Sequence, residues 1–142
     1  FEKKIIKKDD IKLSYRSSGI KNNQIISKAI FNFSVGNPEN IRIKMDTIKD
    51  RRLSSQPIKN KTSGSTFKNP PNFYAAKLIE ESGCKGMTFG NAFVSEKHAN
   101  FLINNGKATA SDLENLGKIV IDKVYNKYHV KLDWEVKIIG EC

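Results

Sequence analysis

Residue types and spacing first suggest chemistry in residues 63–71, which read SGSTFKNPP. Gly64 permits tight backbone geometry, so that the hydroxyl of Ser65 beside it can face a ligand. The spacing Ser65-x-x-Lys68 also occurs in the nucleophile motif of penicillin-recognising enzymes, where it opens a helix. Here two prolines, Pro70 and Pro71, stop any helix at once, and the downstream S-D-N and K-T-G motifs are absent from the sequence. From spacing alone, a structural loop is the favoured interpretation.

Other polar residues that could do chemistry have ordinary explanations as well. Glu135 lies on the polar side of an alternating stretch, with a charged residue two positions away on either side. This is typical of a solvated or cross-strand-paired carboxylate. Arg16 has a similar place in an earlier alternating stretch, and Arg51-Arg52 comes at a predicted helix end, where cations suit the carbonyl end of the dipole. From their positions in the sequence alone, all of these are predicted to be surface residues.

The cysteines and histidines do not form a metal-binding pattern. Cys84 and Cys142 are far apart, with no C-x-x-C motif, and no histidine lies near them in metal spacing. His98 and His129 are isolated from each other. We predict two free thiols in a reducing cytoplasm and no metal site.

The charge balance is basic, with 25 Lys and Arg against 15 Asp and Glu and a net charge of +10. A basic nucleic-acid-binding module without catalysis is therefore an alternative function. The cations are spread over the whole chain, however, and the zinc-finger spacing, aromatic RNA-binding motif and basic-region heptad of known modules are absent from the sequence. A general solvated surface is favoured, and we expect no nucleic-acid partner.

Length and hydropathy place further limits on the class of protein. The 142 residues suit one domain, and the sequence has no apolar run of the roughly 20 residues that a membrane span needs. The N-terminus carries acidic residues and no apolar core, so we do not expect a signal peptide or a membrane partner. The first residue is not Met, which suggests a processed chain or a piece of a longer one.

The N-terminal half contains two predicted strands and one predicted helix. Apolar and polar residues alternate over 11–16 and over 29–35, which predicts an antiparallel β-hairpin. Asn37-Pro38-Glu39 is typical of a helix start, and the apolar stripe that follows predicts a helix to about Arg52. The punctuated stretch 56–72 predicts an extended loop.

The C-terminal half alternates between helical and extended patterns. A short helix is predicted over 73–82, closed by Gly83, and two short apolar stretches follow at 92–95 and 101–104. Thr109 and Asp112 resemble a capping box before a helix. That helix carries one apolar stripe, which consists of Leu113, Leu116, Val120 and Val124. The clearest predicted strand is 130–138, where apolar and charged residues alternate strictly. The fold class is therefore α+β, with a small mixed or antiparallel sheet and packed helices.

Seven ordered stretches carry a family resemblance. They are Tyr15-Arg16-Ser17-Ser18, Arg52-x-x-x-Gln56-Pro57, Gly64-Ser65-x-Phe67-Lys68-Asn69-Pro70, Ala76-x-Leu78-Ile79-Glu80-x-x-Gly83, Val94-Ser95-Glu96-Lys97-His98-Ala99-Asn100-Phe101, Ala108-Thr109-Ala110-x-Asp112 and Leu132-x-x-Glu135-Val136-x-Ile138-Ile139-Gly140. Together they span nearly the whole chain. In this order they resemble the C-terminal part of the UDP-N-acetylenolpyruvoylglucosamine reductases. The similarity is to the subclass with the serine-glutamate-lysine-histidine segment and without an extra tyrosine-bearing insertion.

The resemblance implies roles for matched positions. Ser65 resembles the serine that protonates the enolpyruvyl carbon after hydride transfer from reduced flavin. Arg16 and Glu135 resemble the arginine and glutamate that stabilise the intermediate. Further positions match residues that contact the substrate or its diphosphate, and these are Tyr15, Arg52, Gln56, Asn69, His98 and Lys137. Lys137 stands where relatives commonly have Arg, so a bidentate contact there is in question.

The resemblance also implies a domain organisation and cofactors. Residues 1–36 would be the C-terminal tail of the FAD-binding domain, including the predicted β-hairpin, and residues 37–142 the substrate-binding domain. FAD would be bound mainly by an N-terminal domain absent from this chain, with NADPH as reductant, and the sequence has no Gly-rich phosphate loop. The implied partners are UDP-N-acetylglucosamine enolpyruvate and the N-terminal FAD-binding part of the same enzyme, in the bacterial cytoplasm. We expect the chain alone to be inactive.

Overall fold

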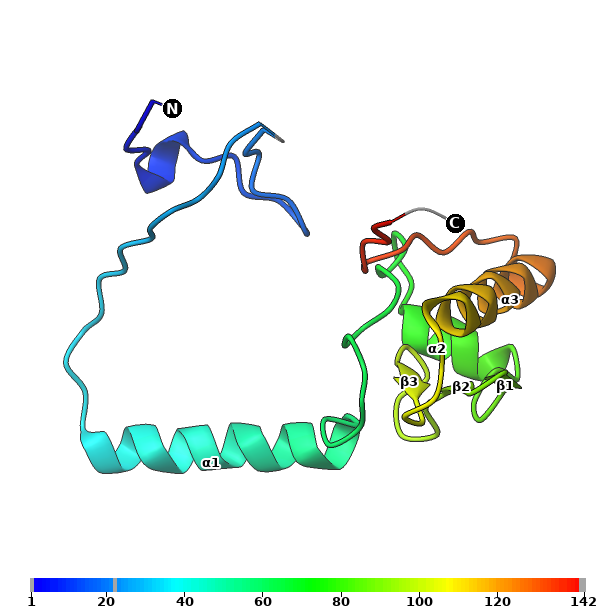
Figure 1. Cartoon of the computed structure of the whole chain (residues 1–142). Helices are drawn as coiled ribbons and strands as arrows, with labels where there is room; N and C mark the ends of the chain where they lie inside the picture. Colours follow the sequence, from blue (N-terminus) through cyan, green and yellow to red (C-terminus); the bar gives the residue numbers. More distant parts are fainter. Residues whose placement is uncertain (1, 22, 141–142) are drawn as a thin grey trace. The chain divides into compact units, whose positions relative to one another are not determined.

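The computed structural model describes residues 2–21 and 23–140, and the chain divides into two compact units, residues 1–36 and residues 37–142 (Figure 1). Each unit has its own local structure and is described separately. The assignment of the two units to a flavin-binding and a substrate-binding domain stays a prediction.

The first unit contains little regular structure. Its described residues include one 3₁₀ turn, η1 (Lys8–Asp10), and one isolated bridge, in which Ser14 and Ser17 exchange backbone hydrogen bonds of 2.9 and 3.1 Å. Arg16 lies inside the turn that this bridge closes, and its φ is +57°. A turn therefore begins inside the stretch 11–16, where alternation predicts a strand.

The predicted β-hairpin over 11–16 and 29–35 is wrong, because neither stretch forms a strand in the described part of the first unit. Its apolar side chains are exposed, with Leu13 at 65%, Phe33 at 87% and Val35 at 103%. An isolated hairpin is at best marginally stable in water, and alternation gives a strand only where a core takes up one face. This unit offers those side chains no such core.

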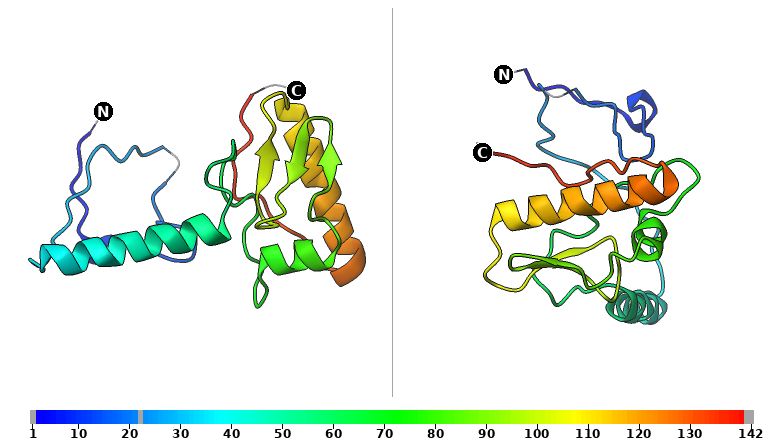
Figure 2. Two further views of the ribbon diagram at one scale, coloured as in Figure 1. Left: turned by 90° about the horizontal axis from the view of Figure 1, so that it is seen from below. Right: turned by 90° about the vertical axis from the view of Figure 1, so that its right-hand side faces the viewer.

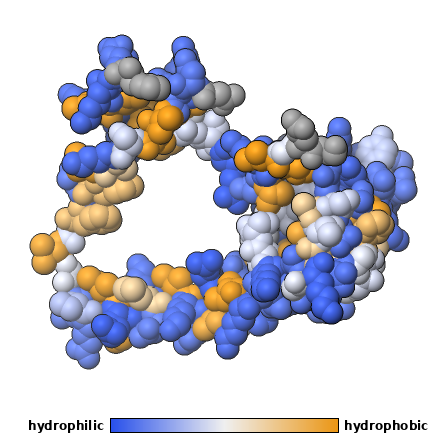
Figure 3. Space-filling view, in the orientation of Figure 1, coloured by the Kyte–Doolittle hydropathy of each residue, from blue (hydrophilic) through white to orange (hydrophobic). Residues whose placement is uncertain are grey.

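The predicted helix after residue 36 is confirmed as α1 (Pro38–Ser55). The Oδ1 of Asn37 accepts the N–H of Asn40 at 3.0 Å, and the following proline occupies the first helical position, as predicted. The helix ends at Ser55 instead of near Arg52. Its predicted apolar stripe is about half exposed, which Figure 3 shows as apolar residues among polar ones along the helix.

The core of the second unit lies between two helices and a small sheet. The helices are α2 (Ala75–Glu81) and α3 (Ala110–Tyr128). The strands β1 (Thr88–Phe89), β2 (Ala92–Val94) and β3 (Leu102–Asn104) form an antiparallel sheet in the order β1-β2-β3. Both views in Figure 2 show α3 running along one face of this sheet. The predicted α+β class and antiparallel sheet are confirmed.

The predicted apolar stripe of α3 contributes to the core. Leu116, Val120 and Val124 are completely buried, together with Ile79 of α2 and Val94 of β2. An apolar stripe at helical spacing buries one face of the helix against the sheet and leaves the other polar face in water.

The capping box of α3 is also confirmed. The Oγ1 of Thr109 accepts the N–H of Asp112 at 3.1 Å, and the carboxylate of Asp112 accepts the N–H of Thr109 at 3.0 Å. Gly83, at φ +70°, ends the turn after α2 in the left-handed conformation that favours glycine.

The predicted strand over 130–138 is wrong, because in this described stretch only Trp134 pairs, in an isolated bridge. Leu132 is buried and Trp134 is bridged to Phe67, whereas Ile138 and Ile139 are 56% and 91% exposed. The bridged stretch is short because its partner is an irregular segment that begins after a glycine and ends at a proline, which cannot donate to a ladder. Alternation predicts the burial of Leu132 here, but neither the exposure of Ile138 nor the length of the pairing.

The described residues include no helix that is both long enough and apolar enough to cross a membrane.

Candidate active site

Ser65 lies directly after a glycine whose backbone no other residue could adopt easily. Gly64 has a φ of +92°, and a side chain added there would meet nothing within 4 Å. Ser65 itself is half-buried and pairs with Phe101 in an isolated antiparallel bridge. The serine therefore stands at the start of an ordered segment, with open space on the glycine side.

The segment that follows Ser65 is paired on both of its edges. On one edge the N–H of Thr66 donates to the carbonyl oxygen of Asn100 at 2.8 Å. On the other edge the carbonyl oxygen of Thr66 accepts the N–H of Glu135 at 2.9 Å. Thr66 and Phe67 are each only 2% exposed. This short segment therefore pairs with two other segments, although it is too short to form a strand.

Glu135 belongs to the outer edge of this arrangement. Its neighbour Trp134 bridges to Phe67, and the two aromatic rings pack with centroids 5.0 Å apart. The Glu135 side chain is half-buried. The structure therefore brings the backbones of Ser65 and Glu135, far apart in the sequence, into directly paired segments.

The packing of Trp134 on α3 holds the outer edge in place. A Cβ added at Gly117 would lie 2.0 Å from the Cη2 of Trp134, so only a glycine lets the indole approach the helix this closely. The sequence pattern did not predict this contact, and a glycine inside a strongly helical stretch was its one visible signal.

Asn69 and His98, both predicted to bind substrate, also make structural contacts. The Oδ1 of Asn69 accepts the N–H of Ala75 at 3.0 Å, where α2 begins. The Nδ1 of His98 accepts the N–H of Asn100 at 3.3 Å, and the imidazole packs edge-on against Phe101 with centroids 4.7 Å apart. Both side chains are therefore oriented by the elements around the Ser65 segment.

Burial, hydrogen bonding and neighbouring charges all act on the pKa of His98, some lowering it and some raising it. Burial of the imidazole lowers this pKa most strongly, a hydrogen bond with its own backbone raises it, Lys85 lowers it and Glu80 raises it. The sum is a pKa below the ordinary value of 6.5. The neutral ring that results can accept the N–H of Asn100.

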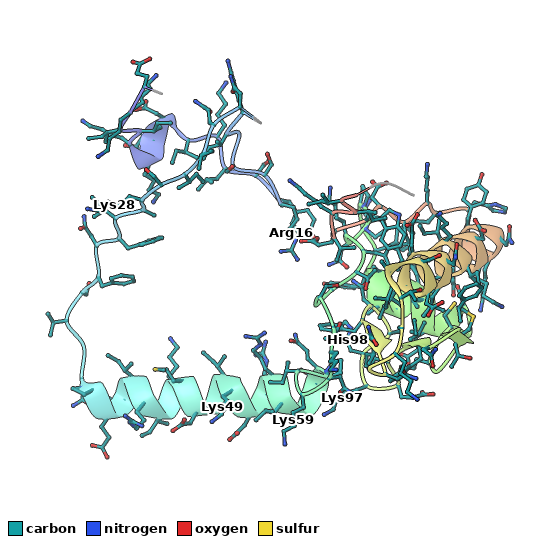
Figure 4. All side chains as sticks on the ribbon, viewed as in Figure 1. Arg16, Lys28, Lys49, Lys59, Lys97 and His98 are labelled. Atoms are coloured by element: carbon teal, nitrogen blue, oxygen red, sulfur yellow. The ribbon has the colours of Figure 1, made fainter. Side chains whose placement is uncertain are left out.

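Arg52 and Gln56 lie together at the C-terminal end of α1. The backbone N–H of Gln56 donates to the carbonyl oxygen of Arg52 at 2.9 Å, and the Arg52 side chain is exposed. The ammonium of Lys97 donates to the carbonyl oxygen of Leu53 at 2.7 Å, and Figure 4 shows Lys97 and His98 beside this helix end. The end of α1 is thereby tied to the loop that carries His98.

The three other predicted residues are Tyr15, Arg16 and Lys137. Tyr15 and Arg16 belong to the first unit, where the guanidinium of Arg16 lies 5.6 Å from the centroid of the Tyr15 ring. Lys137 is exposed and lines an open groove of about 470 Å³ beside the start of α3. Their part in a shared site stays a prediction.

The described residues contain no group of three or more side chains able to hold a metal ion. Cys84 is a free, buried cysteine, and burial raises the pKa of its thiol while Lys123 lowers it to a smaller extent. Cys142 lies outside the described residues. The polar groups that the site does offer are the Ser65 hydroxyl and the Glu135 carboxylate, on paired segments, and these suit proton transfer.

Comparison with known proteins gives the family. The family model described as the C-terminal domain of UDP-N-acetylenolpyruvoylglucosamine reductase matches residues 56–139, which include both Ser65 and Glu135. The chain is 48% identical over 132 residues to the reductase of that name from Rickettsia conorii. It is also 48% identical over 130 residues to the one from Rhodopseudomonas palustris. These matches cover 93% and 92% of the chain.

A solved structure supports the same assignment. The crystal structure of UDP-N-acetylenolpyruvylglucosamine reductase from Thermus caldophilus superposes with a TM-score of 0.75 at 32% identity, covering 89% of this chain. The α+β fold is thus that of a reductase's C-terminal region. The chain belongs to the UDP-N-acetylenolpyruvoylglucosamine reductase family, as the seven sequence stretches predict. It spans somewhat less than half the length of these relatives, 45% and 42% for the two curated ones and 46% for the solved structure.

Proposed function

We propose that this chain is the C-terminal part of an FAD-dependent reductase that converts UDP-N-acetylglucosamine enolpyruvate to UDP-N-acetylmuramate with NADPH, in bacterial peptidoglycan synthesis. One observation carries the proposal: Ser65 and Glu135 come from segments that are directly hydrogen-bonded through Thr66, inside the region that matches the family. The nucleic-acid alternative gains no support from these matches.

The residues of the site fit a reaction in which a hydride and a proton add across a carbon–carbon double bond. The flavin, held by the N-terminal domain, supplies the hydride when it is bound. Ser65 gives its hydroxyl proton to the other carbon of the enolpyruvyl group. A neutral hydroxyl needs a positioned neighbour to give up its proton, and beside Ser65 a Cβ added at Gly64 would meet nothing within 4 Å.

Arg16 and Glu135 act on the charge that develops during the reaction. Hydride addition pushes negative charge into the substrate carboxylate, which the planar guanidinium of Arg16 can hold with two hydrogen bonds. Glu135, anchored beside the Ser65 segment, orders the site and stabilises the intermediate together with Arg16.

The remaining predicted residues bind the substrate away from the reacting carbons. Arg52 and Gln56 at the end of α1 and His98 in the adjoining loop suit the diphosphate region. Asn69 and Tyr15 contact the substrate or its diphosphate, and Lys137 supplies a point charge where an arginine would supply a fork. Residues 1–36 then complete the FAD-binding domain, and residues 37–142 form the substrate-binding domain.

A hybrid reductase tests this function. In the hybrid, this chain replaces the matching C-terminal part of the Rickettsia conorii reductase. We expect the hybrid to oxidise NADPH over many turnovers only when the enolpyruvyl substrate is present, whereas the 142-residue chain alone should be colourless and inactive. A correctly folded hybrid that reduces its flavin but never the substrate would refute the proposal. Stoichiometric flavin on the chain alone would refute the domain assignment.

A further inference from the structure

Asn100 is a buried polar residue that directly precedes Phe101, the bridge partner of Ser65. It is 4% exposed, and its carbonyl oxygen accepts the N–H of Thr66 at 2.8 Å. The chain turns sharply just before it, since the N–H of Phe101 donates to the carbonyl oxygen of His98 at 3.0 Å. Asn100 therefore lies at the last position where backbone pairing with the Ser65 segment is possible.

The side chain of Asn100 forms hydrogen bonds with the next residue of the Ser65 segment, beyond the last backbone hydrogen bond. Because the N–H of Thr66 already donates to the carbonyl oxygen of Asn100, the alternation of a regular antiparallel ladder would point the peptide groups of Phe67 away from this strand. Here the Oδ1 of Asn100 nevertheless accepts the N–H of Phe67 at 2.9 Å, and its Nδ2 donates to the carbonyl oxygen of Phe67 at 2.8 Å. One carboxamide thus replaces a whole peptide unit of a neighbouring strand.

This replacement matters because the surroundings exclude water. Phe67 is 2% exposed, so without Asn100 its N–H and carbonyl groups would have no solvent to turn to. On the opposite side of Ser65, Gly64 has open space and an unusual backbone conformation. The position of Ser65 is therefore fixed mainly from its C-terminal side, through the residues that Asn100 holds.

We propose that Asn100 is a positioning residue for proton donation: its carboxamide fixes the Thr66–Phe67 segment and thereby sets the position of the Ser65 hydroxyl. This inference rests on the proposed function of Ser65. Proton transfer depends steeply on geometry, and a displacement of about 1 Å at a reacting group can cost roughly 100-fold in rate. Asn100 does not itself touch the reacting atoms.

The variant Asn100→Asp provides a test because its hydrogen bonding changes with pH. An ionised carboxylate accepts hydrogen bonds but cannot donate to Phe67, whereas the protonated acid has one donor and one acceptor, as the amide has. Other titratable or charged groups around this segment are present in both proteins, so the unsubstituted protein measured over the same pH range is the first control. They are His98, whose Nδ1 accepts the N–H of Asn100, and Lys68, Asp133 and Glu135 on the paired segments.

Amide hydrogen exchange of the 142-residue chain tests the clamp independently of any catalysis. In Asn100→Asp at high pH a carboxylate oxygen replaces the Nδ2 that donates to the carbonyl oxygen of Phe67, so two acceptors face each other and repel. We expect this repulsion to open the clamp, so that protection of the Phe67 amide falls well below that of the unsubstituted protein at high pH and recovers as pH decreases. Asn104→Asp is the matched control, because Asn104 holds the turn to Ala108 with the same chemistry and its side chain makes no hydrogen bond to the Ser65 segment. Unchanged protection of Phe67 in Asn100→Asp at high pH would overturn the proposal.

The hybrid reductase then tests positioning. In Asn100→Asp, we expect flavin reduction by NADPH to be unchanged and reoxidation by the enolpyruvyl substrate to be slowed about 10–100-fold at high pH, with recovery as pH falls. A reoxidation rate that stays normal while Phe67 is deprotected would overturn the proposal.

Two further outcomes are distinguishable from these. If Asn100→Asp does not fold at high pH, Asn100→Gln replaces it: the amide is kept but displaced by one methylene, so reoxidation should be slow at every pH, and a normal rate would overturn the proposal. If the unsubstituted hybrid never reduces the substrate, the proposed function fails first and the positioning role fails with it.

Discussion

The backbone N–H of Glu135 donates a 2.9 Å hydrogen bond to the carbonyl oxygen of Thr66, the residue that follows Ser65. Together with the 2.8 Å bond from the N–H of Lys68 to the carbonyl oxygen of Asp133, this bond connects the C-terminal segment to the loop that carries Ser65. The separation of the two side chains therefore depends on how the C-terminal segment is held, and Trp134 on α3 holds it.

The first prediction concerns Gly117. A methyl group at this position would overlap the Trp134 ring, since a Cβ would lie 2.0 Å from its Cη2. Gly117→Ala should therefore lower the free energy of unfolding by about 1–3 kcal/mol, the usual effect of overpacking, despite alanine's better helix propensity. Because Trp134 is the one tryptophan of the chain, its fluorescence reports the displacement directly during urea unfolding.

Asn126→Ala, on an exposed position of the same helix, serves as the control and should change stability by no more than about 0.5 kcal/mol. A Gly117→Ala protein with unchanged fluorescence and stability would show that the close contact between Trp134 and α3 does not exist.

A second prediction concerns the capping box of α3. Thr109→Ala removes the hydroxyl that accepts the N–H of Asp112, and should cost about 1 kcal/mol of stability at neutral pH. The measurement is urea unfolding followed by circular dichroism. Ser111→Ala, one residue into the helix and exposed, is the control for the loss of a hydroxyl.

The same cap predicts a pH dependence through Asp112. The N–H of Thr109, followed by that of Asn91 and the hydroxyl of Thr109, keeps the pKa of this carboxyl below its ordinary value of 3.8, although burial opposes them. The contribution is fully present above about pH 4 and is lost as pH falls through the lowered pKa. The stability difference between the unsubstituted protein and Asp112→Asn should shrink below that pH, and a constant difference would contradict the cap.

The third prediction concerns His98. Its lowered pKa means that the unfolded chain binds a proton at a pH where the folded protein does not, so stability rises with pH up to about 6.5 and then levels off. His98→Asn keeps an acceptor near the position of Nδ1. Its free energy of unfolding should fall less between about pH 7.5 and pH 5 than that of the unsubstituted protein. NMR titration of the imidazole checks the pKa directly, and a value above 6.5 would contradict the burial of this ring.

Most of the second unit could be predicted from its sequence, because its signals are local. The Asn37 cap, the glycine stop at Gly83 and the capping box at Thr109 depend on residues within one turn. The stripe of α3 is long enough for the period of 3.6 to be unambiguous. The hairpin over 11–16 and 29–35 could not be judged in this way, since strand formation depends on a core that the sequence pattern does not reveal.

The candidate site shows the same limit. Its members could be named from motifs, but their pairing could not, because Thr66 contacts both Asn100 and Glu135 through long-range hydrogen bonds. Asn100 stands in one of the motif stretches, yet nothing in its spacing shows that its carboxamide pairs with Phe67. Only the folded structure shows where backbone pairing ends and where the Asn100 side chain forms the hydrogen bonds.

The most direct measurement for the central claim is stopped-flow analysis of the two half-reactions of the hybrid reductase carrying Ser65→Ala. Flavin reduction by NADPH should be unaffected, because no substrate proton is needed there. Reoxidation by the enolpyruvyl substrate should slow by about 10²–10⁴-fold, as expected for a lost general acid, and Ser65→Cys, which keeps a donor, should lose less. Reoxidation at the unsubstituted rate, or equal slowing of both half-reactions, would contradict the role of Ser65 as the proton donor.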